Sequence, residues 1–327
     1  MNEALIKKYG DLIKSGKSVV DRKKKVISVS PAIDIGLGGG IPEGSLFILT
    51  GKPKAGKTTT SLMFAKNAQL DGREIYYLNI EGRLRARDLA GILGLDLEKF
   101  HVIESSQGNI LSAQKYLEIA EVIINTVPNA VVIIDSFSAL CTQEEMTADI
   151  DKMLRADGPK LLAKFCRKIA NVLPVNNTIL VGITHISSNV TGYGSPFTEK
   201  SGWALAYQVD VKLWAKGMKD WRLSDDSGQI GQIVEWDVIT SAISGPGQKV
   251  QSYIRYGEGI DNFTELANMA ADMGIIKKGG AWYTLNKDDG SEEKVQGLEK
   301  VRLYLKDNPK VYDHIKSEVY TLMGVKV

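Results

Sequence analysis

The segment Gly51–Thr59, which reads GKPKAGKTT, restricts the possible folds of this chain more than any other feature. It matches the pattern G-x-x-x-x-G-K-[ST] and lies between an apolar run, Ser45–Thr50, and a helix-forming stretch that begins at Thr58. A strand, a glycine-rich turn and a helix start direct backbone N–H groups at phosphate oxygens, and the helix dipole adds to the attraction. The flanking elements argue against a chance glycine-rich turn, so the segment predicts a nucleoside triphosphate site.

Two side chains of this segment have specific roles in such a site. Lys57 reaches the outer phosphates, and the Thr58 hydroxyl ligates Mg²⁺. The residues predicted to contact the nucleotide are Gly51, Lys52, Pro53, Lys54, Ala55, Gly56, Lys57, Thr58 and Thr59.

Composition excludes some classes of protein. A chain of 327 residues has room for about two domains. Its formal net charge of +2 is too small to indicate a nucleic-acid binder, so DNA binding requires local patches. Cys141 and Cys166 lack metal-ligand spacing and suit a reducing compartment. The chain shows neither a secretory signal nor an apolar stretch that could span a membrane, so we expect a soluble, cytoplasmic protein.

Apolar runs and amphipathic stretches alternate from residue 33 to about 266. The predicted strands are Leu46–Thr50, Glu74–Ile80, Ala130–Ser136, Thr178–Thr184, Val209–Trp214, Ile233–Ile239 and Val250–Tyr256. The predicted helices are Ser61–Gln69, Arg87–Ile92, Ser112–Asn125 and Gly158–Val172. This order predicts an α/β fold with a mostly parallel sheet covered on both faces, and the late strands predict an antiparallel extension.

The two ends of the chain differ from this pattern. Glu3–Lys14 predicts a short amphipathic helix and Val26–Val29 a strand, which together are too small to bury their own apolar faces. They pack either on this chain's own core or on a second copy. After residue 263, helices are expected at Thr264–Met273, Val301–Lys306 and Pro309–Met323, with a hairpin at Ala281–Leu285. These elements predict a small α/β domain.

Three apolar strands end in polar residues that suit phosphate chemistry. Asp135 ends one strand and is predicted to orient a metal ion beside Thr58. Glu81 follows the strand Tyr76–Ile80, at the sheet edge where open α/β sheets build their sites, and a carboxylate there can polarise a water molecule. His185 follows Thr184 at the same edge and can sense the outer phosphate. A turn-capping aspartate, a surface glutamate and a structural histidine are the alternatives.

Two further segments are candidates for contact with DNA. The loop 186–202 is long and rich in glycine, and apolar side chains among glycines suit single-stranded nucleic acid. The stretch 158–172 carries Lys160, Lys164, Arg167 and Lys168, which either follow a phosphate backbone or form a solvated face. The DNA-binding candidates are Lys160, Arg167, Val190, Tyr193, Phe197 and Gly202.

Taken together, these stretches resemble the RecA family of recombinases over nearly the whole chain. The matching stretches are SVSPAIDIGLGGGIPEGSLFILTGKPKAGKTTT, LNIEG, VVIIDSFSAL, GSPFTEKSGWAL, IRYGEGID, GAWYTLN and YLKDNP. The last three separate the chain from P-loop ATPases that share only the core. The resemblance implies a RecA-like P-loop ATPase core at 31–265, an N-terminal oligomerisation arm at 1–30 and a small C-terminal domain at 266–327.

The resemblance also implies a function. It implies a DNA-dependent ATPase that uses ATP and Mg²⁺, with Glu81, Lys57 and His185 as catalytic residues and Thr58 and Asp135 at the metal. Such a protein forms a helical filament on single-stranded DNA, pairs it with homologous duplex DNA and works with loading or single-strand-binding proteins. The setting would be a bacterial cell or a phage-infected host.

The chain departs from the bacterial pattern at three places. Thr184-His185 replaces an asparagine–glutamine pair, and the histidine at this position is similar to the phage UvsX branch. The tyrosine that stacks on adenine is missing after Glu81, where Arg85 or Arg87 could stack instead. Thr240 and Ala242 replace two lysines that reach the neighbour's ATP, so either Lys212, Lys216 or Lys249 supplies the cation or hydrolysis is slow.

The missing lysine pair motivates an alternative function. In that alternative the chain is a filament-forming, DNA-binding accessory protein with weak or no strand exchange. A helicase-like motor is a third possibility, which the resemblance of the C-terminal segment disfavours.

Overall fold

A ten-stranded mixed sheet forms the centre of the molecule within the part that the structure describes. The computed structural model describes residues 3–151, 158–189, 197–199, 205, 208–224, 226–287 and 290–325. The sheet runs in the order β12-β11-β10-β9-β3-β7-β6-β4-β5, and β8 pairs with β7. The strands from β9 to β5 are parallel, whereas β10, β11 and β12 are antiparallel, which confirms the predicted sheet and its extension.

The strands of this sheet have the following bounds. They are β3 (Leu46–Gly51), β4 (Ile75–Asn79), β5 (Phe100–Ile103), β6 (Val131–Asp135), β7 (Ile179–Ser188), β8 (Phe197–Glu199), β9 (Val211–Trp221), β10 (Gly231–Thr240), β11 (Lys249–Arg255) and β12 (Gly259–Ile260). Both β7 and β9 extend beyond the predicted strands, and β5 was not predicted. Only Phe100 of β5 is fully buried, so this edge strand lacks the apolar run that predicted the others.

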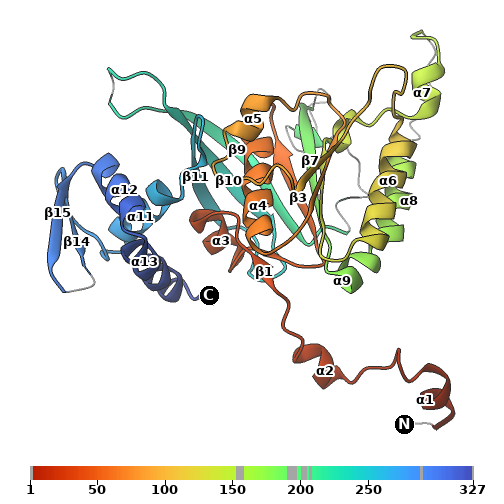
Figure 1. Ribbon diagram of the computed structural model, residues 1–327, viewed down its shortest axis with the longest axis horizontal. Helices are drawn as coiled ribbons and strands as arrows, with labels where there is room; N and C mark the ends of the chain where they lie inside the picture. Colours follow the sequence, from red (N-terminus) through yellow and green to blue (C-terminus); the bar gives the residue numbers. More distant parts are fainter. Residues whose placement is uncertain are drawn as a thin grey trace.

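Alternate residues of the central strands pack on opposite faces, as the two-residue period of a strand requires. Phe47 and Leu49 of β3 face one apolar cluster, whereas Leu46 and Ile48 face the other. The first cluster includes α3 (Pro31–Leu37) and α4 (Lys57–Leu70). The second includes α6 (Ala113–Thr126), α8 (Gly158–Ile169) and α9 (Val172–Asn176), which lie together at one end of the molecule (Figure 1). The sheet is therefore covered on both faces.

Short elements connect these layers. They are α5 (Ala86–Ala90), the 3₁₀ helix η1 (Phe137–Ala139), α7 (Gln143–Thr147) and β2 (Ile41–Pro42), which pairs with β1 (Val26–Ile27). Within the described residues, no helix combines the length and apolar character that crossing a membrane requires.

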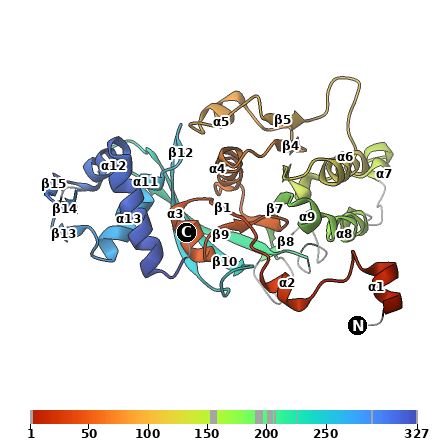
Figure 2. The same ribbon diagram turned by 60° about the horizontal axis from the view of Figure 1, so that its bottom comes forward.

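The chain after β12 forms a tail domain with an apolar cluster of its own. It contains α11 (Asn262–Asp272), β13 (Lys277–Gly279), β14 (Trp282–Asn286), β15 (Glu292–Gln296), α12 (Leu298–Asp307) and α13 (Pro309–Leu322). The three strands pair antiparallel in sequence order, so the expected hairpin is part of a larger sheet. Figure 2 shows this domain at the opposite end of the molecule from α6 and α8.

The N-terminal arm leaves the body of the molecule (Figure 1). Its helices are α1 (Glu3–Tyr9) and α2 (Gly16–Val20), so the first is shorter than predicted and the second was not predicted. Leu12 is 79% exposed and Val20 is 84% exposed. The arm therefore does not bury these apolar side chains in the described part of its own chain.

Candidate nucleotide site

The segment predicted to bind phosphate lies between β3 and α4, the strand and helix that its flanking sequences predicted. Gly51 has φ +152°, and a Cβ there would lie 2.8 Å from Cβ of Ala215 on β9. Gly56 has φ +73°, and a Cβ there would lie 2.3 Å from Cδ1 of Ile254. Both positions therefore require glycine, for space as well as for backbone conformation. No side chain caps the start of α4, a helix of 14 residues, which leaves its first N–H groups available to a phosphate.

Lys57 is folded against the loop that precedes it. Its Nζ donates to the carbonyl oxygens of Gly51, at 3.0 Å, and of Lys52, at 2.7 Å. Burial lowers the pKa of Lys57 to about 8, while the charges of Asp135 and Glu81 act in the opposite direction. The lysine is therefore mostly charged at neutral pH and held at the floor of the site.

Thr58 and Asp135 meet at the start of α4. The hydroxyl of Thr58 donates to Oδ2 of Asp135 at 2.8 Å, and the Tyr77 hydroxyl donates to the same oxygen at 2.6 Å. Burial raises the pKa of Asp135. Tyr77 was missed by sequence reasoning, because its partner lies 58 residues away and a tyrosine in an apolar run gives no signal of such a contact. A hydroxyl and a carboxylate are hard oxygen ligands, so the pair fits a Mg²⁺ that also takes phosphate oxygens and water.

The backbone after β4 positions Glu81. Oδ1 of Asn79 accepts from Arg83 N at 3.1 Å, and the N–H of Glu81 donates to the Asp135 carbonyl at 3.2 Å. These bonds close a turn that points the Glu81 carboxylate along the sheet edge. Oε1 of Glu81 then lies 2.7 Å from Nε2 of His185 and accepts from Ser136 Oγ at 2.8 Å.

The His185 hydrogen bond, with help from Ser136, lowers the pKa of Glu81 to about 2. An ionised carboxylate only accepts, so the proton of this bond lies on Nε2 of His185. Nδ1 of His185 is buried and has no hydrogen-bond partner among the described residues, while its backbone N–H donates to Ser138 Oγ at 2.8 Å. The pair suits orientation of a water molecule better than strong proton abstraction, because a carboxylate with so low a pKa is a weak base.

One cavity of about 300 Å³ brings the predicted chemical residues together. Its lining includes Lys57, Thr58, Glu81, Asp135 and His185. It also includes residues that were not predicted, namely Tyr77, Asn79, Arg83, Leu84, Asp88 and Gln232.

A second cavity, of about 480 Å³, adjoins the first. Thr59 and Asp88 line both cavities. The second is also lined by Arg87 from α5 and by Tyr256 after β11, whereas Arg85 lines neither. Of the two predicted stacking residues, Arg87 is therefore the one beside the phosphate loop.

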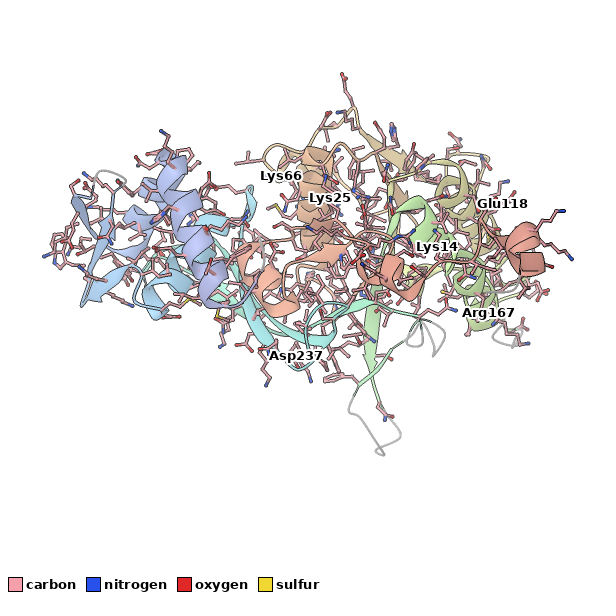
Figure 3. All side chains as sticks on the ribbon, turned by 90° about the horizontal axis from the view of Figure 1, so that it is seen from below. Lys14, Lys25, Lys66, Glu118, Arg167 and Asp237 are labelled. Atoms are coloured by element: carbon pink, nitrogen blue, oxygen red, sulfur yellow. The ribbon has the colours of Figure 1, made fainter. Side chains whose placement is uncertain are left out.

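The predicted DNA-binding residues separate into three groups. Phe197 on β8 lies edge-on to Trp214, with ring centroids 6.4 Å apart, and Lys52 Nζ lies 5.2 Å from its ring centroid. Lys160 and Arg167 are exposed on α8, and Figure 3 shows Arg167 at the periphery of the molecule. Val190, Tyr193 and Gly202 lie outside the described residues.

The three candidate interface lysines surround the end of β10. Lys212 pairs across the sheet with Thr240, and Lys249 pairs with Asp237. Nζ of Lys216 lies 3.8 Å from Oδ2 of Asp237, which Figure 3 labels at the edge of the molecule. Lys212 is 9% exposed, so Lys216 and Lys249 are the more accessible cations.

Comparisons with known proteins agree with this architecture. The family model of the RecA N-terminal domain matches residues 3–261, and that of the RecA C-terminal domain matches residues 264–324. The chain is 31% identical to chromosomal Protein RecA of Lactococcus lactis subsp. lactis (strain IL1403), over 98% of this chain and 82% of that relative. It is 30% identical to Protein RecA of Aquifex aeolicus (strain VF5), over 90% of this chain and 83% of that relative. The chain therefore belongs to the RecA family of recombinases.

Proposed function

We propose that this chain is a DNA-dependent ATPase that forms a helical filament on single-stranded DNA and promotes pairing and strand exchange with homologous duplex DNA. The observation that carries the proposal is the path of hydrogen bonds from α4 to β7. Thr58 bonds to Asp135, and the next residue, Ser136, bonds to Glu81. Glu81 in turn bonds to His185 on β7.

This path joins the nucleotide to the predicted DNA-binding loop. β7 leads from His185 into the loop 186–202, and Phe197 of that loop lies against Lys52 of the phosphate-binding loop. A rearrangement of the contacts of Glu81 when the outer phosphate binds would therefore act on His185, near the end of β7. We infer that nucleotide state and DNA contact are coupled here.

The two adjoining cavities accommodate a nucleotide as a whole. The triphosphate occupies the first cavity, at Lys57 and the start of α4, and Mg²⁺ is held by Thr58 and Asp135. The base then enters the second cavity beyond Thr59, where the guanidinium plane of Arg87 can stack on it. When bound, the metal neutralises charge that develops on the phosphate oxygens.

Two exposed surfaces suggest how this chain binds DNA and a second copy of itself. The exposed lysines and Arg167 of α8 provide charge for a phosphate backbone. The exposed apolar residues of the N-terminal arm provide area for a second copy of the chain. At the interface between two copies, Lys216 and Lys249 supply the positive charge of the two bacterial lysines, whose positions are occupied here by Thr240 and Ala242. We place this activity in the cytoplasm of a bacterial cell or a phage-infected host.

Lys57→Ala tests the proposal directly. The variant should lose ATP-dependent filament growth, because it removes the buried cation that is held at the floor of the site. Filament growth is measured by electron microscopy and light scattering with ATP and single-stranded DNA. Lys115→Ala, at an exposed position of α6 away from both cavities, is the control and should grow filaments. Normal filaments and strand exchange in Lys57→Ala would refute the proposal.

Thr240 and Ala242 favour the accessory-protein alternative, because neither can supply a cation to a neighbour's phosphate. ATP turnover with and without single-stranded DNA separates the two functions. A recombinase should hydrolyse ATP faster with DNA, and Lys216→Ala with Lys249→Ala should remove most of that stimulation. Intact DNA binding without any stimulation in the unaltered chain would support the accessory function instead.

A further inference from the structure

A network of charged side chains joins the core to the tail domain. Its members are Arg255 of β11, Glu258 and Asp261 around β12, and Glu299 and Arg302 of α12. Nε of Arg302 donates to Oδ2 of Asp261 at 2.5 Å, and Nη2 of Arg302 donates to Glu258. Arg302 is 4% exposed and the Asp261 side chain is fully buried. This is the most buried ion pair between the two parts of the chain among the described residues.

The segment that Arg302 holds also forms a wall of the second cavity. Tyr256, Gly257 and Gly259 line that cavity, as Arg87 does. Gly259 lies against the phosphate-binding helix α4, since a Cβ there would be 2.6 Å from Sδ of Met63. The segment is therefore placed between α4 and α12.

The backbone of this segment is paired with β11, where Gly259 lies opposite Arg255, and the Glu258 N–H donates to the Arg255 carbonyl at 3.2 Å, but the residues between them are conformationally permissive. Gly257 has φ +80° and Gly259 has φ +88°, so glycines flank Glu258 on both sides. Glycines lose more conformational freedom on ordering than other residues, and a segment of this kind has many alternative conformations. The contact from Arg302 to Glu258 fixes the side chain between the two glycines.

Arg302 is the second guanidinium in a group of three carboxylates, and it makes one contact that Arg255 does not. Asp261 is already paired with Arg255, whose Nε lies 2.9 Å from the same Oδ2, and its Oδ1 caps α11 by accepting from Thr264 N at 3.0 Å. What Arg302 adds is the link to Glu258. The network is thus built to hold the wall of the cavity from the tail domain.

We propose that Arg302 is a positioning residue for the nucleotide base, which holds Glu258 and Asp261 and thereby fixes the cavity wall formed by Tyr256, Gly257 and Gly259. The inference rests on the proposed function, in which the base enters this cavity. It makes the tail domain part of the base site although none of the described tail residues lines the cavity. The phosphate contacts at Lys57 and Thr58 come from the first turn of α4, whereas the wall meets this helix further along, at Met63.

The test compares ATP with inorganic tripolyphosphate, which has the phosphates but no base. Dissociation constants are measured on the full chain with Mg²⁺ for the unaltered protein, Arg302→Met, Arg302→Lys and Lys300→Met. Arg302→Met should weaken ATP binding at least about fivefold, the lower end of typical coupling between sites, and change tripolyphosphate binding less than about twofold. Arg302→Lys should restore part of the ATP affinity. Lys300 is exposed on the same helix, so Lys300→Met should change neither constant.

Glu258→Ala provides a second route to the same result, and it serves if Arg302→Met does not fold. Glu258 is 33% exposed, so its removal leaves no buried unpaired charge on the core side. It should weaken ATP binding selectively, and the double variant should lose little more than either single variant, because both act through one contact.

The outcomes separate this inference from the proposed function. An unaltered chain that binds neither ligand contradicts the proposed function. Suppose that the unaltered chain prefers ATP to tripolyphosphate and that the variants keep the same preference. This result overturns only the role of Arg302. If the variants weaken binding of ATP and of tripolyphosphate equally, the role of Arg302 is also overturned, because a general loosening of the fold would affect both ligands alike.

Discussion

At the scale of single residues, the pair of Glu81 and His185 defines the site. Its hydrogen bond joins strands β4 and β7 across a separation of 104 residues in sequence. The bond lowers the pKa of Glu81 from 4.5 to about 2. A carboxylate with a lowered pKa stabilises the fold above its unfolded-state pKa, and this contribution is lost as the pH falls through the folded-state value. The pair is therefore intact throughout the neutral range.

His185→Phe should raise the pKa of Glu81 toward 4.5, because the first cause of its low value is the bond to His185. DNA-stimulated ATP turnover should fall by about 10²-fold, the lower range for loss of a positioned acid–base group. Carboxyl NMR titration and a turnover assay measure the two effects. His101→Phe is the control, since His101 pairs with Glu74 at an exposed position away from the cavity. Undiminished DNA stimulation in His185→Phe would show that the pair does not couple the two ligands.

At the scale of elements, β7 and η1 depend on one small residue. Gly182 lies in the middle of β7, where a Cβ would be 2.2 Å from Cε2 of Phe137 and 2.7 Å from Cδ1 of Ile48. Phe137 is buried and belongs to η1, between Ser136 and Ser138. Close packing at Gly182 thus determines where the two serines meet Glu81 and His185.

Gly182→Ala should lower the free energy of unfolding by about 1–3 kcal/mol, the usual effect of overpacking a core. It should also reduce ATP turnover, because η1 must shift and move Ser136 and Ser138. Denaturant unfolding and steady-state kinetics test this. Gly228→Ala is the control, since no atom of the described residues lies within 4 Å of a Cβ at that position. Equal stabilities for the two variants would contradict the packing argument.

At the scale of the whole molecule, two buried carboxyl groups lie where the core meets the tail. Burial raises the pKa of Glu265, on α11, to about 7, and that of Asp34, on α3, to about 6. Oε2 of Glu265 accepts from the Ala32 N–H at 3.0 Å, and Oδ2 of Asp34 accepts from the Tyr320 hydroxyl of α13 at 3.0 Å. Groups with raised pKa values stabilise the fold most below their unfolded-state pKa, and this stability is lost as the pH rises through the folded-state pKa.

Glu265→Gln should make the stability of the protein depend less on pH. The unaltered chain should lose about 3 kcal/mol through this group between its ordinary pKa of 4.5 and pH 7, following the shift to about 7. Denaturant unfolding at pH 5 and pH 8 measures the difference, with the exposed Glu98→Gln as control. The same pH dependence in both variants would mean that Glu265 is ionised in the fold.

The sequence predicted the parts of this molecule that carry a local signal. The strands β3, β6 and β7 are continuous apolar runs, and the loop after β3 matches a known sequence motif, so the strands and the loop could be predicted. The candidate residues Lys57, Thr58, Glu81, Asp135 and His185 were predicted with them because they belong to this motif or follow these strands. The contacts of Tyr77 and Ser138 were missed, because they arise only when strands far apart in sequence become neighbours. The charged network around Arg302 was missed for the same reason, since a lone arginine on an amphipathic helix suggests a solvated side chain.

The projecting N-terminal arm has a consequence for any assembly of this chain. Each chain supplies a single arm, so an arm that docks on the body of the next copy makes a head-to-tail contact. Such a series has polarity: one terminus presents a bare body and the other an undocked arm. A peptide of residues 1–25 would then dock on the bare body and stop elongation at that terminus only. A chain shortened to residues 26–327 would accept the undocked arm at the other terminus and stop elongation there, because it has no arm of its own.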